Sequence, residues 1–126
     1  MKKRITNASA KAKGRDFQYW TCQQISDLLD IPWGKDELIA SREAAQCGTD
    51  IRLIAEAQKR FPFSVECKCQ EAWDVPGWIR QAQSNQLEGT DWLLLMKKRY
   101  KDPVIVMDAK SFFKLLRRIE HGSPQK

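Results

Sequence analysis

Hydrophobic and polar residues alternate without interruption along residues 61–70, and this pattern predicts an extended β-strand. Successive side chains of a strand point to opposite faces of the sheet. Every second residue from Phe61 onward therefore contributes to one apolar face, while Glu66 and Lys68 lie side by side on the polar face. The pattern thus places a carboxylate next to an ammonium group on one surface.

Residues 50–56 alternate in the same way, which predicts a second strand beside the first. We predict that the two strands form an antiparallel hairpin, with Asp50 opposite Glu66 and a turn near Gln58. Directly opposed residues in such a pair project from the same face, roughly 5 Å apart. The residues around Gln58 include neither Gly nor Asn, which are the usual hairpin-turn residues. The expected result is a cluster of Asp50, Glu66 and Lys68.

The remaining pattern predicts three helices and three more strands, all within one α/β domain. The expected elements are a helix at 15–29, a strand at 37–42, a helix capped by Asp74 and ending near 87, a strand at 92–96 that is buried on both faces, a strand at 104–107 and a last helix capped by Asp108. Counted with the hairpin, their order is α-β-β-β-α-β-β-α. We expect residues 1–13 to be a flexible basic arm, residues 14–120 to be the domain and residues 121–126 to be a tail.

Composition excludes several classes of protein and of site. With 126 residues, 42% of them hydrophobic, the chain can bury one ordinary core. It has no apolar run of roughly 18 residues, so we expect a soluble, cytoplasmic protein without membrane contact. The single histidine, His121, lies near the end of the sequence, which excludes histidine-based catalysis and catalytic triads. The four cysteines contain no Cys-x-x-Cys pair, so neither a zinc site nor a disulfide framework is expected.

Charge is distributed unevenly, which the net charge of +6 conceals. Residues 1–15 carry six basic groups and no acid, and residues 97–118 carry eight basic groups and two acids. The intervening residues 16–96 carry seven basic and thirteen acidic groups. Two basic ends around an acidic middle suit a protein that binds a polyphosphate while cations sit at its centre. A disordered, solubilising N-terminal arm is the alternative interpretation of the first basic segment.

The cluster of Asp50, Glu66 and Lys68 suits a magnesium-dependent reaction at a phosphate. Carboxylates are hard oxygen ligands of Mg²⁺, for which Mn²⁺ substitutes, and the carbonyl of Cys67 can complete the protein's share. Lys68 would then reach the attacking water or a phosphate oxygen. The alternative is a solvated sheet face with a surface ion pair. An acid two residues before a lysine also occurs at Asp108, so this tripeptide alone is not specific.

The motif Gly-Thr-Asp at residues 48–50, followed by Glu-Cys-Lys at 66–68 in this order of elements, resembles the PD-(D/E)xK nuclease superfamily. Within it, the chain is similar to archaeal-type Holliday junction resolvases and their small phage relatives, over roughly residues 14–116. The helix bearing Trp78 and Gln81 is part of that similarity. The resemblance implies an α/β, restriction-endonuclease-like α-β-β-β-α-β core, with a mixed central sheet flanked by helices and an additional strand and C-terminal helix.

The resemblance also implies roles for individual residues. Arg42, shortly before the motif aspartate, would clamp the phosphate, or would simply form a surface ion pair with Glu43 or Asp50. Resolvases of this type carry a catalytic glutamate in the first helix, where this chain has Gln18. Either Asp16 substitutes for that acid or the acid is missing, which leaves open whether one metal ion or two would bind. Gln81 would face the DNA groove. The residues expected to contact DNA are Lys11, Lys13, Arg15, Lys97, Lys98 and Arg99.

The function implied by the resemblance is a Mg²⁺-dependent endonuclease that cuts DNA phosphodiesters at a four-way junction in a bacterial or phage-infected cell. Two symmetric cuts would imply a homodimer. A second hypothesis is another nuclease of the superfamily, of nicking, repair or restriction type. A third is a noncatalytic DNA-binding module whose carboxylate cluster is structural. Trp33 and Trp73 lie in expected loops and are the candidates for contact with bases or with a second subunit.

Overall fold

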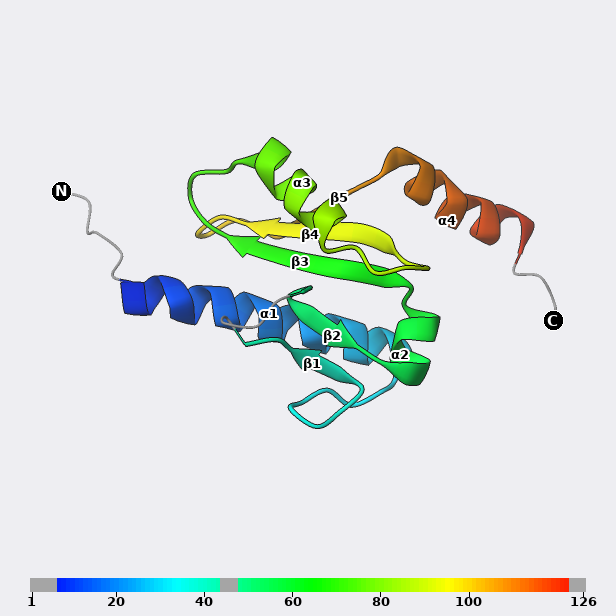
Figure 1. Ribbon diagram of the computed structural model, residues 1–126, viewed down its shortest axis with the longest axis horizontal. Coiled ribbons are helices and arrows are strands. Elements are labelled where there is room, and N and C mark those ends of the chain that lie inside the picture. The colour runs from blue at the N-terminus through cyan, green and yellow to red at the C-terminus, as the bar shows by residue number, and fades with distance from the viewer. Residues whose placement is uncertain (1–6, 44–47, 123–126) are drawn as a thin grey trace.

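The computed structural model describes residues 7–43 and 48–122, and Figure 1 shows their arrangement. The helices are α1 (Asn7–Leu29), α2 (Ala55–Arg60), α3 (Val75–Ser84) and α4 (Ala109–His121). The strands are β1 (Ile39–Ser41), β2 (Ile51–Leu53), β3 (Phe63–Cys69), β4 (Asp91–Lys97) and β5 (Val104–Met107). The described chain is therefore a mixed α/β fold, as the sequence pattern predicts.

The strands of the described chain form two separate sheets. β1 and β2 pair antiparallel in a small sheet, with Ala40 opposite Arg52. β3, β4 and β5 form a mixed sheet in this order, with β3 parallel to β4 and β5 antiparallel to β4. α3 supplies the crossover connection that the parallel pair requires. The result is a mixed sheet flanked by helices (Figure 1).

The mixed sheet is covered on both faces at its central strand β4, which is apolar on both sides. Leu93 and Leu95 belong to a large core shared with α1 and the small sheet. Trp92, Leu94 and Met96 belong to a second core under α3. In Figure 1, α1 and the small sheet lie on one side of β3 and β4, and α3 lies on the other. The prediction that this strand is buried on both faces is confirmed.

The predicted hairpin between the second and third strands is wrong, and a helix takes the place of its turn. The residues expected to form the turn belong to α2, whose Ala57 is fully buried in the large core. The lack of Gly and Asn near Gln58 disfavours a tight turn, and Lys59 and Arg60 suit the last turn of a helix. β2 and β3 consequently belong to different sheets, although they remain adjacent at Asp50.

Two predicted aspartate caps begin helices α3 and α4. The Asp74 carboxylate accepts a hydrogen bond from the Gly77 N–H at 3.2 Å. The Asp108 carboxylate accepts one from the Lys110 N–H at 2.8 Å. Both caps satisfy backbone N–H groups that the start of a helix leaves unpaired, so both predictions are confirmed.

α1 begins at Asn7, well before the predicted helix start at Arg15. Residues 7–13 are helical because they are rich in alanine and lysine, which favour helices, so the prediction of a flexible arm is wrong for them. Residues 1–6 of that arm lie outside the described residues. At the other end, His121 is the last residue of α4 rather than part of a tail. Within the described ranges, no helix has the length and apolarity needed to cross a membrane.

The cysteines that the structure describes are free thiols. Cys22 and Cys67 are buried in the large core, and Cys69 is partly buried beside it. Burial raises the pKa of Cys22 to about 12, so this thiol stays protonated and unreactive at neutral pH. These residues act as small apolar side chains. Cys47 lies outside the described residues.

β5 and α4 leave many apolar side chains exposed. β5 is an edge strand of the mixed sheet, and α4 projects beyond the end of that sheet in Figure 1. α4 touches the large core through Leu115, and its Lys114 forms an ion pair with Asp91 of β4 at 2.8 Å. The exposed apolar residues, which we call the β5–α4 surface, are Val104, Ile105, Phe112, Phe113, Leu116 and Ile119.

Candidate active site

Asp50 lies directly before β2 and is held against one edge of β3 by two hydrogen bonds. Its N–H donates to the Val65 carbonyl at 3.0 Å, and its carboxylate Oδ2 accepts from the Cys67 N–H at 2.7 Å. These two β3 residues flank Glu66, so the bonds fix Asp50 beside it. The proximity that the hairpin was expected to provide is therefore achieved by a contact at one residue, without a strand ladder.

Glu66 is buried beneath α3 rather than exposed on a solvated sheet face, since only 1% of the residue is accessible. Its Oε2 accepts a hydrogen bond from Nδ2 of Asn85, the residue that follows α3, at 2.9 Å. No group in the described part of the chain donates to its Oε1. The interpretation as a solvated surface ion pair is therefore wrong. Asn85 is a site residue that the strand pattern could not indicate, because its position depends on where α3 ends.

The carboxyl groups of Asp50 and Glu66 contact each other, and both pKa values rise. Burial raises the pKa of Glu66 to about 7, and the negative charge of Asp50 adds to this effect. Burial also raises the pKa of Asp50, against the lowering effects of the Cys67 N–H and of Lys68. A hydrogen bond between two carboxyl groups requires a proton on one of them, and the raised pKa of Glu66 keeps that group partly protonated near neutral pH.

Lys68 follows Glu66 on the same face of β3 and brings positive charge to the two acids. Its charge lowers the pKa of Asp50 and that of Glu66, opposing the effect of burial. Its Nζ lies 5.9 Å from the centre of the Trp78 ring, which is a cation–π distance. The structure thus brings together the three residues of the expected cluster.

Arg42 is anchored at the end of the small sheet, close to Asp50. Its backbone N–H donates to the Asp50 carbonyl at 2.8 Å, and its Nε donates to the Thr49 carbonyl at 2.6 Å. Its positive charge lowers the pKa of the Asp50 carboxyl group. Gly48 has a φ of 103°, and a Cβ there would lie 3.5 Å from Arg42 Nε. The guanidinium is therefore held beside the acids by the backbone of the motif itself.

An open groove of about 1250 Å³ adjoins the cluster, between the first half of α1 and the loop that joins β4 to β5. Asp50, Cys67 and Lys68 line it, and so does Asp16 of α1. Gln18, which stands where the resembled family has an acid, accepts a hydrogen bond from Ser41 Oγ at 2.5 Å instead. Gln18 thus ties α1 to β1, and Asp16 is the α1 acid that reaches the groove.

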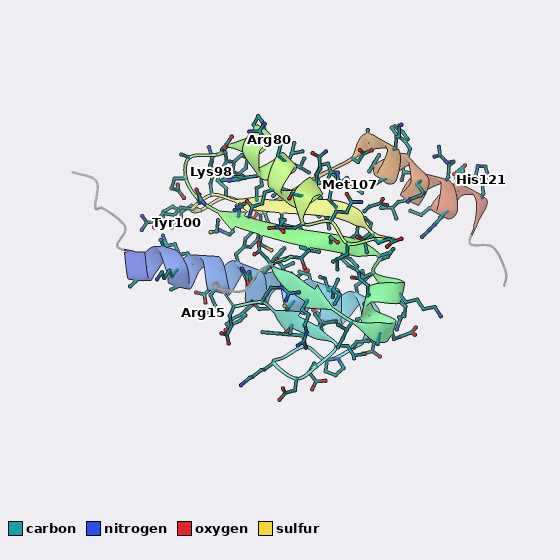
Figure 2. All side chains as sticks on the ribbon, viewed as in Figure 1. Arg15, Arg80, Lys98, Tyr100, Met107 and His121 are labelled. Atoms are coloured by element: carbon teal, nitrogen blue, oxygen red, sulfur yellow. The ribbon has the colours of Figure 1, made fainter. Side chains whose placement is uncertain are left out.

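Most of the residues expected to contact DNA line this groove. They are Lys11, Lys13, Lys97 and Arg99. Lys98 does not, and its Nζ packs over the Trp73 ring at 4.9 Å. Figure 2 shows Arg15 on the opposite side of α1 from the β4–β5 loop residue Tyr100. Gln81 is exposed on α3 and is not among the residues that line the groove.

The two loop tryptophans singled out for contact with bases or a second subunit pack against the protein. The indole N–H of Trp33 donates to Gln23 at 2.8 Å, and Trp73 packs against the second core with its indole nitrogen buried. Trp20 and Tyr100 line the groove instead. Helical spacing alone could not separate Trp20 from the core residues of α1.

The described residues contain no group of three or more His, Cys, Asp or Glu side chains that could hold a metal ion. Mg²⁺ needs only one or two carboxylates, because water and substrate phosphate complete its octahedral shell. A cation would compensate both the Oε1 of Glu66, to which no described group donates, and the adjacent Asp50 carboxylate. The Cys67 N–H points to Asp50, and the N–H and C=O of one strand residue leave the same edge, so the Cys67 carbonyl lies on this side too. The residues present therefore fit a magnesium ion.

Comparison of the chain with protein-family models, with curated proteins and with solved structures yields no match. The resemblance to PD-(D/E)xK nucleases accordingly stays a prediction from the sequence. The function has to be argued from the geometry of Asp50, Glu66 and Lys68 and from the groove beside them.

Proposed function

We propose that this protein is a Mg²⁺-dependent, structure-specific DNA endonuclease of the PD-(D/E)xK type, resembling Holliday junction resolvases. The observation that carries the proposal is the buried contact between the Asp50 and Glu66 carboxyl groups beside Lys68. Placing two acids together in a buried site costs stability. Arrangements of this kind are typical of functional sites, where a bound cation offsets that cost.

A restriction-endonuclease-like core is the fold that we propose for this function. It is supported by an aspartate directly before β2, a Glu-x-Lys sequence on β3 and a helix that joins β3 to the parallel strand β4. The separate small sheet is a departure, because in such a core β2 would continue the main sheet beyond β3. Here the continuity between the sheets is carried by the hydrogen bonds of Asp50.

Each residue of the cluster has a distinct role in the proposed reaction. Asp50, Glu66 and the Cys67 carbonyl would hold Mg²⁺, which lowers the pKa of water and neutralises charge on the attacked phosphate. Lys68 orients the attacking water and stabilises the charge that develops on the phosphate oxygens. Asn85 fixes Glu66 through Oε2 and leaves Oε1 for the cation. As a ligand of the cation Glu66 would be deprotonated, because ligands must be deprotonated.

DNA is the proposed partner because basic residues of α1 and of the β4–β5 loop line the groove beside the cluster. Cutting two strands of a four-way junction requires two such sites related by a twofold axis, so we include a homodimer in the proposal. The β5–α4 surface supports this, since β5 is an edge strand without a charged residue. Exposed apolar edges of this kind are normally covered.

Cleavage of labelled four-way junction, linear duplex and single-stranded DNA tests the proposal, each with Mg²⁺ or with chelator. We expect paired symmetric cuts in the junction with Mg²⁺ and none with chelator. Asp50→Asn and Lys68→Ala should each lower the rate at least about 100-fold, the usual loss for a group that stabilises transition-state charge. Cutting of linear DNA alone would indicate another nuclease of the superfamily, and binding without cutting would overturn the enzymatic proposal.

Lys110→Ala is the matched control for Lys68→Ala. Lys110 ends the second acid-x-Lys sequence of the chain but lies exposed on α4, outside the groove. Its replacement should leave the rate unchanged, and equal losses in both variants would deny Lys68 a specific role. Calorimetric titration with Mn²⁺ adds a measurement independent of activity. The wild-type protein should bind the ion and Asp50→Asn should not.

A further inference from the structure

The groove beside the carboxylate cluster contains two exposed aromatic side chains that no step of the proposed hydrolysis uses. Trp20 comes from α1 and Tyr100 from the β4–β5 loop, so they reach the groove from its two walls. They line the same groove as Asp50 and Lys68. Aromatic rings in a basic groove are the usual platforms on which unpaired nucleotide bases stack.

Trp20 is supported from below and open to solvent. Its ring stacks on that of Phe17, with centroids 5.9 Å apart and an angle of 25° between the ring planes. Phe17 is buried in the large core, whereas 43% of Trp20 is accessible. The core therefore holds the indole in place while much of its surface stays exposed, which reduces the entropy lost when a ligand binds.

Tyr100 occupies a turn position that tyrosine normally avoids. The Lys101 N–H donates to the Lys98 carbonyl at 3.1 Å, which closes a turn with Tyr100 as its third residue. The φ of Tyr100 is 61°, a conformation for which such turns select Gly or Asn. Its side chain is 86% exposed, so no packing within the described chain explains the choice of tyrosine. Backbone strain of this kind is concentrated at ligand-binding sites.

The charges around these rings suit a phosphate backbone. Lys11, Lys13, Lys97, Arg99 and Lys101 line the groove in addition to Lys68. The acids that line it are Asp16, Asp50, Glu71 and Asp102. One of these, Glu71, already accepts a hydrogen bond from the Arg99 N–H at 2.7 Å, and Asp50 belongs to the cluster. The Arg99 guanidinium lies 5.1 Å from the centre of the Tyr100 ring, so cation and ring are presented together.

We propose that this groove binds an unpaired DNA strand, with bases stacked on Trp20 and Tyr100 and with phosphates beside the lysines of α1 and of the β4–β5 loop. The strand would lead to the cluster at Asp50. That it belongs to the branch point of a DNA that the protein cleaves rests on the proposed nuclease function. The groove would then recognise branched DNA by nucleotides that leave their base pairs at the branch point next to the cut.

Binding of an oligothymidylate of about 12 nucleotides, compared with an abasic strand of the same length, tests this assignment. The measurement is made in chelator, so that cleavage plays no part. The wild-type protein should bind the oligothymidylate at least about 10-fold more tightly, because each stacked base contributes to affinity. Tyr100→Asn should weaken oligothymidylate binding about 5- to 100-fold and leave the abasic strand unaffected.

Tyr100→Asn separates a role in binding from a role in folding, because Asn suits the positive φ of the turn. Its thermal midpoint should equal or exceed that of the wild-type protein, while its preference for bases falls. Trp20→Leu should show the same loss of preference. Tyr19 is the adjacent exposed aromatic residue of α1, but it packs on Trp33 and does not line the groove. Tyr19→Leu should therefore leave the preference for bases unchanged.

Equal affinity of the wild-type protein for the two strands would overturn the assignment, as would an unchanged preference in both groove variants. If the protein binds oligothymidylate more tightly than the abasic strand but cuts no branched DNA, the nuclease proposal is contradicted and the groove assignment is supported. If the protein cuts junctions but binds the two strands equally, the nuclease proposal is supported and the groove assignment is contradicted. The failure of one proposal can thus be distinguished from the failure of the other.

Discussion

At the scale of single residues, the feature that distinguishes this chain is an acid buried against another acid. Glu66 keeps one oxygen on Asn85 and leaves the other without a donor from the described residues. Its raised pKa means that the folded protein holds a proton near neutral pH that the unfolded chain releases. The folding stability of the metal-free protein therefore depends on pH near neutrality, an effect that exposed surface acids do not produce.

We expect Glu66→Gln to remove part of the pH dependence of folding stability. The pKa of Glu66 rises from 4.5 to about 7, so its neutral form stabilises the folded state at low pH, and this contribution disappears as pH rises through about 7. The loss amounts to something on the order of 3 kcal/mol. Urea unfolding in chelator between pH 5 and pH 8 measures it.

Glutamine keeps an oxygen for Asn85 and an N–H for Asp50, so the variant should be more stable than the wild-type protein at pH 8. The difference in unfolding free energy should shrink as pH falls from about 7 towards 4.5 and should level off below 4.5, where Glu66 is neutral in both states. A difference that is constant across this pH range would mean that Glu66 does not carry the proton. The control is Glu56→Gln, at an exposed residue of α2. Its unfolding free energy should depend on pH as that of the wild-type protein does.

At the level of elements, alternation predicted where the strands lie but not their partners, and it extended the second strand into Ala55 and Glu56, which begin α2. One face of β3 consists of polar residues, which the alternating pattern assigns to solvent, yet Ser64 and Glu66 on this face are buried. Their environment is set by α3 and the residues after it, such as Leu87, whose N–H donates to Ser64 at 2.9 Å. A strand under a helix and a strand under water share one local pattern, so only packing between distant segments distinguishes them.

The connection between β2 and β3 shows the same limit. The pattern predicted Asp50 beside Glu66, and the structure brings these residues together, although the hairpin expected to do so is replaced by α2. Buried Ala57 explains why, because it anchors α2 in the large core. Local turn chemistry indicated that something other than a tight turn was required, but not that a helix would supply it.

The cap of α3 leads to a prediction at this scale. A Cβ on Gly77 would collide with the Asp74 carboxylate that caps the helix. Gly77→Ala should therefore displace the cap and cost about 0.5–2 kcal/mol, the same range as Asp74→Ala. Unfolding free energies of both variants and of the double variant measure this.

Because both substitutions remove one and the same hydrogen bond, the double variant should lose less than the sum of the single losses. Additive losses would show that Gly77 has a role apart from the cap. Gly89→Ala provides a comparison: its φ is 82° and its Cβ would meet no atom within 4 Å, so it carries backbone strain without a collision.

In the molecule as a whole, the exposed apolar surface and the candidate active site involve different elements of the protein. The groove adjoins the first half of α1 and the β4–β5 loop. The β5–α4 surface lies on the edge strand β5 and on α4, which lies at the end of the molecule away from the start of α1 (Figure 1). Ile105 and Ile119 are 56% and 77% exposed. Two copies joined through this surface would leave both grooves open for DNA.

We expect Ile105→Lys to convert a dimer into a monomer, because it places a charge on the edge strand that the second copy would cover. Sedimentation velocity measures the mass directly. Ile54→Lys, at an exposed apolar residue before α2, is the matched control and should not change it. A wild-type protein that sediments as a monomer at all concentrations would contradict the proposed interface.

Asp50 stands where the two sheets meet, so its carboxylate contributes to the packing of the sheets in addition to its role in the proposed reaction. Alanine at position 50 would remove the oxygen that accepts the hydrogen bond of the Cys67 N–H. This backbone amide would then lack a partner, and the contact between the two sheets would be weakened. An asparagine retains an oxygen at that place while discarding the negative charge. Loss of activity in Asp50→Ala would therefore not distinguish misfolding from the loss of a reactive group. Loss of activity in an Asp50→Asn variant with a normal melting temperature would instead identify the missing negative charge as the cause.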